Sequence, residues 1–401
     1  MSLKTWRTIK LKNGVNMQDM DYYQIEYPST KNVTFGTVEP GITNIRKQLI
    51  DVAMNGLGEM FDPKTQLFYD RVVQTPDGYL IATDHNLRYS LISLLGLYQF
   101  EIWGGQSPIN ISRTLQCILD DTSVIKNGAD AGLLLWLTSL VSPEKVTSLY
   151  LQLDIDNLFN RFSDAKRGET KSLGWLLTGL SFASMTTGSQ INRWSRAARS
   201  VADQLIRNYG GKGIFYSRSI YTIGGILKSG VSNFVDQINA IYGLTVFSTL
   251  FDSPEAREIS LNCAINLAAQ QGESGQWWWE YKVSTGKAIR KYPIFSAHQY
   301  GLAPMALAAI GKITGVDFKL NINKGLQWVA GNNECFANLI DSKNAVIWSG
   351  VKTERRNQSL NPFKTIYGII NSPKMSRKFV IPLECRPSQL GWLLYALSPE
   401  N

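Results

Sequence analysis

The stretch DAGLLLWLTSL, from Asp130 to Leu140, decides the fold, because after one charged residue it is apolar on almost every side. Five other stretches repeat this form, with a polar opening followed by about three turns of apolar and small residues. They are RYSLISLLGLY (88–98), KSLGWLLTGLS (171–181), DQINAIYGLTVFS (236–248), HQYGLAPMALAAI (298–310) and RPSQLGWLLYAL (386–397). A helix that is apolar nearly all round is a buried one. The sequence therefore predicts six buried helices.

A more amphipathic stretch precedes each of the six apolar ones, so two kinds of helix alternate along the chain. Pro143 and Pro254 suit the first turn of such a helix, where a missing N–H costs nothing. The amphipathic helices are expected at Ile45–Gly56, Ile109–Asp120, Pro143–Phe162, Gln190–Asn208, Pro254–Gln271 and Ile322–Gly331. Twelve helices in this alternation make six hairpins.

The simplest closed arrangement of six hairpins is a double ring, with the apolar helices inside and the amphipathic helices outside. This predicts an all-α protein, an (α/α)6 toroid in a single domain over residues 44–401, preceded by an N-terminal arm over residues 1–43. An open solenoid is the alternative, but it needs near-constant repeat lengths and polar end caps. Irregular spacing of the stretches favours closure. Glycines that would let the inner helices approach closely are Gly96, Gly132, Gly174, Gly243, Gly301 and Gly391.

The connections from outer to inner helices are long, at residues 57–83, 209–232, 272–296 and 332–385. Within them QLFYDRVV, GKGIFYSRS, QWWWEYKVS and AVIWSGVKT alternate like short strands, so we expect β-hairpins there. In a ring of hairpins these loops share one end with the N-termini of all six inner helices. Long loops on a rigid scaffold usually carry function, and helix N-termini attract anions. This end, which we call the mouth, is expected to hold the site.

Composition and charge narrow the function classes. The formal net charge is +9, but the Lys and Arg residues are spread along the chain, which favours an anionic small molecule, glycan or lipid surface over nucleic acid. No secretory signal and no apolar span of ~20 residues occurs, so we expect a cytoplasmic protein without a transmembrane segment, with peripheral membrane contact left open. Two histidines and four scattered cysteines show no metal-binding spacing, and no glycine-rich phosphate loop occurs. Neither a metal nor a cofactor is expected.

Two resemblances follow from motifs in the second half of the chain. QGESGQW, from Gln271 to Trp277, resembles the Gln-x-x-x-Gly-x-Trp motif of the squalene-cyclase and protein-prenyltransferase toroids, where Gln and Trp tie helix ends to the next turn. QWWWEY (276–281), YPIFSAHQYGLAPMALAAI (292–310) and ECRPSQLGWLLYAL (384–397) resemble a family of bacterial toroid proteins associated with polysaccharide biosynthesis. The resemblance implies the toroid fold and a sugar substrate, lipid-linked or polymeric.

Asp84 and His298 are the first two candidates for catalysis. Asp84 falls in TDHNLRYS (83–90), placed on the first turn of the first inner helix with Asp84 and Arg88 on one face. In a purely structural alternative, Asp84 caps the helix and pairs with Arg88. His298 opens the fifth inner helix, and an unperturbed histidine pKa near neutrality suits general acid or base work.

Glu384 and Asp236 complete the catalytic candidates. Glu384 lies just outside the sixth inner helix, because Pro387 suits the first helical position. A Glu384–Arg386 pair that only fixes the loop is the alternative. Asp236 follows Asn233, a better cap, which frees Asp236 for chemistry, whereas Asp130 is expected only to cap its helix.

Polar and aromatic side chains around these residues form the expected substrate-binding set. Arginine can clamp a carboxylate or phosphate, and aromatic rings stack on sugars, although they also fill cores. Alternate rings of the 277–281 run are expected to face the mouth. The set is His85, Arg88, Lys171, Gln237, Trp277, Trp279, Tyr281, Gln299, Arg386 and Gln389.

This composition of the mouth predicts a carbohydrate-active enzyme acting on an acidic or lipid-linked glycan. A hydrolase would use two of the three candidate carboxylates. A lyase or epimerase would place Arg88 or Arg386 on a uronate carboxylate, with His298 or Tyr281 as the base. One alternative is a terpenoid cyclase or prenyltransferase, although its Asp-rich motif is missing from the sequence. Another is a non-catalytic glycan-binding scaffold, which would show no strongly shifted pKa among its carboxylates.

Overall fold

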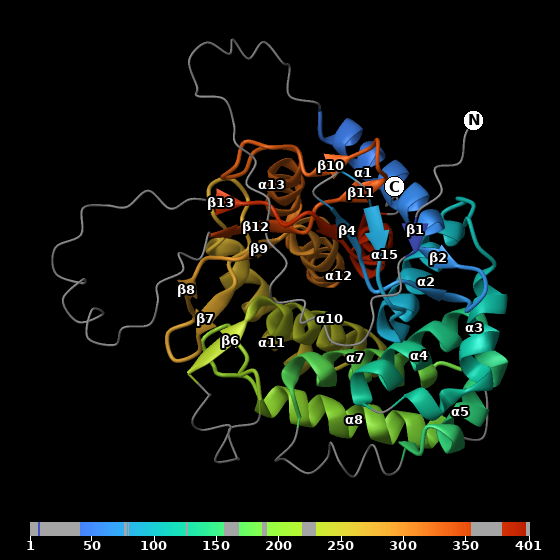
Figure 1. Ribbon diagram of the computed structural model, residues 1–401. Coiled ribbons are helices and arrows are strands. Elements are labelled where there is room, and N and C mark those ends of the chain that lie inside the picture. The colour runs from blue at the N-terminus through green and yellow to red at the C-terminus, as the bar shows by residue number, and fades with distance from the viewer. Residues whose placement is uncertain are drawn as a thin grey trace, which may run out of the picture.

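The computed structural model describes residues 7–8, 41–75, 78, 80–125, 127–155, 168–186, 191–218, 230–353 and 379–397. The six apolar stretches form helices around a common centre (Figure 1). These inner helices are α2 (Leu87–Ile102), α4 (Gly128–Val141), α7 (Thr170–Ala183), α10 (Phe234–Phe251), α12 (Ala303–Thr314) with a π-helical turn (His298–Leu302) before it, and α15 (Pro387–Leu397). Each packs against the next, and α15 packs against α2. The ring is closed, and the predicted (α/α)6 toroid is confirmed.

The outer ring surrounds the inner one (Figure 1). It consists of α1 (Ile42–Glu59), α3 (Ile111–Asp120), α5 (Val146–Gln152), α8 (Ile191–Arg207), α11 (Pro254–Ala269) and α13 (Lys319–Val329). The helix expected at Pro143–Phe162 is instead a 3-10 turn (Pro143–Lys145) followed by α5, and residues 156–162 lie outside the described residues. In the described ranges, no helix has the length and apolar character needed to cross a membrane.

Glycines bring the backbones of neighbouring inner helices into contact. A Cβ atom built on Gly243 of α10 would lie 2.6 Å from the carbonyl oxygen of Gly174 on α7. One built on Gly391 of α15 would lie 2.6 Å from the carbonyl oxygen of Ile92 on α2. Real Cβ atoms essentially never come this close to other heavy atoms. The predicted role of glycine in close helix approach is therefore confirmed.

The Gln-x-x-x-Gly-x-Trp motif ties one outer helix to the next. Gln271, which follows α11, donates from Nε2 to the carbonyl oxygens of Gly275 and Asn321, both at 2.9 Å. Gly275 has a φ of +100°, and a Cβ atom there would collide with the backbone of Lys324 on α13. This is the structural role that the resemblance to other toroids implies.

Short strands form sheets at the mouth that join different hairpins. Strand β14 (Glu384–Cys385) pairs antiparallel with β4 (Val72–Gln74), so the last long loop meets the first. In the described part of GKGIFYSRS there are isolated bridges at Phe215 and Arg218 but no strand. The other strands are β1 (Arg7–Thr8), β2 (Phe61–Asp62), β3 (Leu67–Phe68), β5 (Leu80–Ala82), β6 (Val231–Asn233), β7 (Glu280–Lys282), β8 (Lys287–Arg290), β9 (Ile294–Phe295), β10 (Ile340–Asp341), β11 (Val346–Ile347), β12 (Gly350–Thr353) and β13 (Phe379–Val380).

These strands make five small sheets, in the orders β1-β5-β4-β14, β13-β12-β9, β6-β7-β8, β2-β3 and β10-β11. Strand β1 belongs to the expected N-terminal arm and pairs parallel with β5. Most of that arm lies outside the described residues. β-Hairpins are thus present in three of the four long loops, as β2–β3 and β4–β5, β7–β8, and β10–β11, and the described part of the loop 209–232 has none of its own.

Aromatic side chains fill the centre of the ring below the mouth. The ring of Trp136 on α4 lies 5.4 Å from that of Tyr242 on α10 and 5.1 Å from that of Tyr395 on α15. Trp392 lies 6.0 Å from Trp136 and 6.3 Å from Trp175. The hydroxyl groups of Tyr242 and Tyr395 are 2.8 Å apart. We call these five residues the aromatic floor.

Replacing Gly132 by Ala should destabilise the fold, because the new Cβ atom would lie 2.6 Å from the Cα atom of Leu176 on α7. Overpacking of this kind costs about 1–3 kcal/mol. Gly58, near the end of α1, is the control, since its added Cβ atom would meet only Pro108 at 3.4 Å or more. Urea unfolding should show a lower free energy of unfolding for Gly132→Ala than for the wild type, and an unchanged one for Gly58→Ala. Equal unfolding free energies in the two variants would contradict the backbone contact.

Candidate active site

Three inner helices begin with an asparagine cap. The side chains of Asn86, Asn127 and Asn233 each accept a hydrogen bond from the backbone N–H three residues later. Each cap satisfies a donor that the first turn of a helix leaves free. In α4 and α10 the residue so held is an aspartate, Asp130 or Asp236. The local caps therefore fix two carboxyl groups at the mouth.

Asp130 is held on both sides of its carboxylate. Its Oδ1 accepts from Nε of Arg88 on α2 at 2.5 Å, and its Oδ2 accepts from Nδ2 of Asn127 at 2.6 Å. The guanidinium group of Arg88 lies 5.7 Å from the centre of the Trp175 ring. The expectation that Asp130 only caps its helix is wrong, because Asn127 is the cap. The sequence signal for this role of Asn127 is the Asn-x-x-Asp spacing of Asn127 and Asp130, which Asn233 and Asp236 repeat.

Asp236 is buried at the start of α10, with 2% of its surface exposed. Its Oδ2 accepts from the hydroxyl of Ser217 at 2.6 Å and from that of Ser232 at 3.4 Å. Burial raises the pKa of this carboxyl to about 6, although the Ser217 hydrogen bond acts in the opposite direction. Among the described residues, no donor reaches Oδ1. Asp236 can therefore carry a proton near neutral pH.

Asp84 and His85 precede α2 and do not lie on its first turn. Asn86 caps the helix, and both preceding side chains are exposed. His85 Nε2 lies 2.9 Å from Oδ2 of Asp62. Arg88 pairs across to α4 instead of back to Asp84. The predicted Asp84–Arg88 face and the alternative of an Asp84 cap are both wrong, because the four-residue spacing holds only within a helix.

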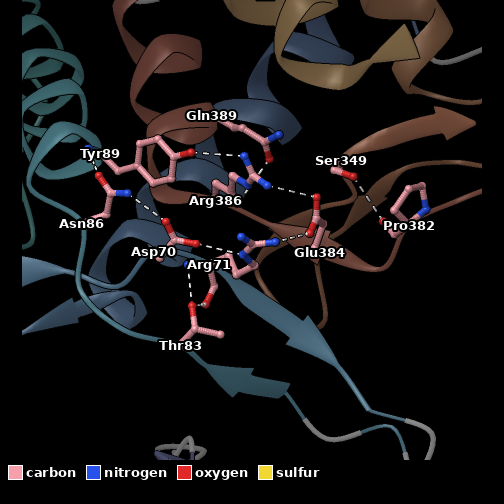
Figure 2. A network of polar contacts seen from close by, with 10 residues as sticks. All are labelled: Asp70, Arg71, Thr83, Asn86, Tyr89, Ser349, Pro382, Glu384, Arg386 and Gln389. Atoms are coloured by element: carbon pink, nitrogen blue, oxygen red, sulfur yellow. Dashed lines mark hydrogen bonds and ion pairs between the residues drawn. The ribbon is translucent and has the colours of Figure 1, made fainter. Parts of the chain in front are cut away.

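Ion pairs join the first and last long loops at the mouth (Figure 2). Arg71 Nε lies 2.8 Å from Oδ2 of Asp70, and Arg71 Nη1 lies 3.1 Å from Oε2 of Glu384. Arg386 Nη2 lies 3.5 Å from Oε1 of the same glutamate, and Arg386 Nη1 donates to the hydroxyl of Tyr89. We call this network, with the β4–β14 pairing, the seam. Glu384 thus pairs with arginines of both loops, as the alternative of a pair that fixes the loop expects.

His298 opens the fifth inner helix as expected, but it lies in an apolar site. It is 4% exposed, and the rings of Phe234, Trp279 and Phe295 lie 4.8–6.1 Å from its own. Burial lowers the pKa of His298 to about 3, because the charged form is excluded from such a site. The expectation of a pKa near neutrality is therefore wrong. His298 is a neutral imidazole at physiological pH.

Four of the predicted substrate-binding residues are buried in the core. Gln237 binds the backbone of Phe215 through both amide atoms, at 2.7 Å and 3.2 Å. Trp277 and Tyr281 are each 1% exposed, and Gln299 has no exposed surface. The run 277–281 thus places these two rings in the core instead of at the mouth.

The other predicted binding residues lie close to the ends of inner helices. Lys171 Nζ lies 3.7 Å from Oε2 of Glu169, and Trp279 is half-buried. Gln389 accepts the backbone N–H of Arg386 and so supports the start of α15. Arg88, Lys171 and Arg386, which were expected to bind an anionic substrate, are thus each paired with a carboxylate of the protein. Within the described ranges, no cluster of three His, Cys, Asp or Glu residues could hold a metal ion.

No protein-family model matches the sequence, and no curated protein matches it significantly. Solved structures share its fold. Unsaturated glucuronyl hydrolase from Bacillus sp. GL1, described as responsible for the degradation of glycosaminoglycan, is 14% identical, with a TM-score of 0.57 over 89% of this chain and 96% of that one. An unsaturated glucuronyl hydrolase specific for heparin matches with the same values.

A mutant of the unsaturated glucuronyl hydrolase from Streptococcus agalactiae is 12% identical, with a TM-score of 0.56 over 94% of this chain and 97% of that one. At these identities the likeness establishes the toroid fold alone. It gives no support to the predicted similarity to terpenoid cyclases or to a role in polysaccharide biosynthesis.

Replacing Asp236 by Asn should flatten the pH dependence of stability. The folded pKa of about 6 lies above the ordinary aspartate pKa of 3.8, so the folded state binds more protons between these values. Wild-type stability therefore falls as the pH rises through that window, by ~3 kcal/mol in total. Urea unfolding at about pH 4 and pH 7 should show this loss in the wild type and not in Asp236→Asn. Parallel pH dependence in the two proteins would mean that the carboxyl ionises as it does in water.

Proposed function

We propose that the protein is a glycoside hydrolase acting at the mouth of the toroid on a glycan that contains an acidic sugar. The observation that carries the proposal is the buried, protonatable carboxyl of Asp236, which shares the mouth with the arginine-held carboxylate of Asp130. Two carboxyl groups in unlike surroundings are what acid–base cleavage of a glycosidic bond requires. The fold shared with hydrolases that are named for glucuronyl substrates supports the same choice.

In this proposal Asp236 is the general acid. Its Oδ1 donates a proton to the glycosidic oxygen as the bond to the anomeric carbon breaks, and the leaving sugar departs as an alcohol. Water adds to the anomeric carbon and gives its proton to Asp130, which Arg88 and Asn127 hold in place.

The alternatives fit the described residues less well. A glycan-binding scaffold has no need of a carboxyl whose pKa is raised to about 6. A lyase or epimerase needs a base beside the sugar carbon from which the proton is taken. His298, the base proposed for those reactions, is enclosed by aromatic rings. Hydrolysis needs only the two carboxyl groups described here, the protonatable Asp236 and the ionised Asp130.

Loss of either carboxyl group should abolish turnover without unfolding the protein. Asp236→Asn and Asp130→Asn should each lower kcat/KM by about a hundredfold or more, because each removes a proton-transfer group. In the wild type, kcat/KM should decrease as the pH rises above about 6, where Asp236 loses its proton. The assay is release of reducing ends from oligosaccharides containing uronic acid.

The control is Asp252→Asn at the opposite end of α10, where the aspartate side chain is 93% exposed. Its activity should match that of the wild type. Full activity in Asp236→Asn, with a melting temperature equal to that of the wild type, would refute the assignment of the acid.

A thermal-shift comparison tests the substrate class independently of turnover. A ligand that binds only the folded state must raise the melting temperature. Uronic-acid oligosaccharides should do so in Asp236→Asn, whereas neutral glycans and prenyl diphosphates should not. Stabilisation by a prenyl diphosphate alone would favour the cyclase alternative and overturn the proposal.

A further inference from the structure

We propose that the β7–β8 hairpin is a second binding site for the glycan, on which an acidic polysaccharide lies as it extends beyond the mouth. We call this segment the basic hairpin and define it by Lys282, Lys287, Arg290 and Lys291. The inference rests on the proposed function, because that proposal is the reason for taking the bound polymer to be a glycan. It adds that this polymer is polyanionic and longer than the mouth alone would hold.

The basic hairpin places like charges directly opposite one another. Lys282 of β7 and Lys287 of β8 are register partners in the antiparallel pairing. Directly opposed side chains in such a pair have Cβ atoms ~4.5–5.5 Å apart, and like charges there are destabilising. Neither ammonium group has a carboxylate partner among the described residues. An anion bound across both lysines would relieve this repulsion.

The remaining cations extend the same positive surface. Arg290 is 63% exposed and has a carboxylate partner, Glu280, at 3.1 Å. The ammonium group of Lys291 lies 4.8 Å from the centre of the Trp278 ring. The side chain of Ile289, which precedes Arg290 in the sequence, is 51% exposed. The hairpin thus presents four cations against one carboxylate, beside an exposed apolar side chain.

The basic hairpin is continuous with the proposed active site. Strand β7 pairs with β6, in which Ser232 lies opposite Tyr281. The Ser232 hydroxyl contacts Asp236 at 3.4 Å, and the backbone N–H of Phe234 donates to the carbonyl of Trp279 at the start of α10. A polymer whose scissile bond lies at Asp236 therefore has this sheet next to it. Strand β8 is the edge strand on the side of the sheet away from β6.

A polyuronate is the anion that suits these features. Each uronic acid carries one carboxylate, so the chain presents charge at regular intervals, and its sugar faces can pack on exposed apolar groups. The hairpin shows no exposed aromatic ring on which nucleic-acid bases would stack, since Trp278 is 9% exposed. The site adjoins a proposed glycosidase centre, which a lipid surface would block.

The test compares two triple variants that lose the same charge. In one, Lys282, Lys287 and Lys291 of the basic hairpin are replaced by Gln. In the other, Lys47, Lys312 and Lys319, exposed lysines of α1, α12 and α13, are replaced by Gln. Both are made in the full chain carrying Asp236→Asn, so that no turnover occurs. Calorimetric titration with hexagalacturonate and digalacturonate is carried out at low and high salt.

We expect hexagalacturonate to bind about tenfold more weakly to the hairpin variant at low salt, because three exposed charge pairs of modest strength are lost. The difference should shrink at high salt, where exposed charges are screened. The control variant should bind as the parent does, and digalacturonate should not distinguish the three proteins. Unchanged hexagalacturonate affinity, an equal loss in both variants, or tighter binding of a duplex DNA of matched charge would each overturn the inference.

Failure of the inference and failure of the proposed function can be told apart. If no uronic-acid glycan is cleaved by the wild type but hexagalacturonate binding still depends on the hairpin lysines, the hydrolase proposal fails and the docking surface stands. If cleavage requires Asp236 but chain length and hairpin charge have no effect on binding, the hydrolase stands and the docking surface fails.

Discussion

Contact between helix backbones at glycine is the constraint on which the rest of the structure depends. Gly174 with Gly243, and Gly391 with the backbone of α2, bring helix axes closer than any side chain would allow. These close approaches, between α15 and α2, α4 and α7, and α7 and α10, draw the six helices into a small closed ring. Closure then brings the N-termini of the inner helices together at one end. The charged and aromatic residues of the mouth meet for that reason, although they lie hundreds of positions apart in the sequence.

Much of this fold could be predicted because its signals are local. Each inner helix shows an apolar run, each outer helix an amphipathic one, and caps such as Asn233 and prolines such as Pro387 mark the first turns. The contacts of the charged residues could not be predicted in the same way. Arg88 was expected to pair within its own helix, but the cap at Asn86 starts that helix too late, and its partner Asp130 comes from the next hairpin.

Burial was the second quantity that the sequence did not reveal. His298 and Gln237 lie at polar openings of apolar helices, which made them candidates for the mouth. Residues outside their own helices then enclose both, with the rings of Phe234, Trp279 and Phe295 around His298 and the backbone of Phe215 against Gln237. Asp236 has the same kind of environment, yet one of its oxygens is left without a donor among the described residues. The candidate site thus depends on the burial of Asp236 and on the hydroxyl groups of Ser217 and Ser232 beside it, and neither can be read from the sequence.

The seam has a consequence for how the protein is made. Arg71 and Glu384 are separated by 313 positions, and they join the first and last hairpins across the point of closure. At ribosomal rates of ~5–20 residues per second, the first hairpin waits roughly 15 to 60 s for its partner. During that time strand β4 lacks its β14 neighbour, and the apolar face of α2 lacks α15. A nascent chain of this fold therefore has a long period of exposure to aggregation, and protection by chaperones matters most before the sixth hairpin emerges.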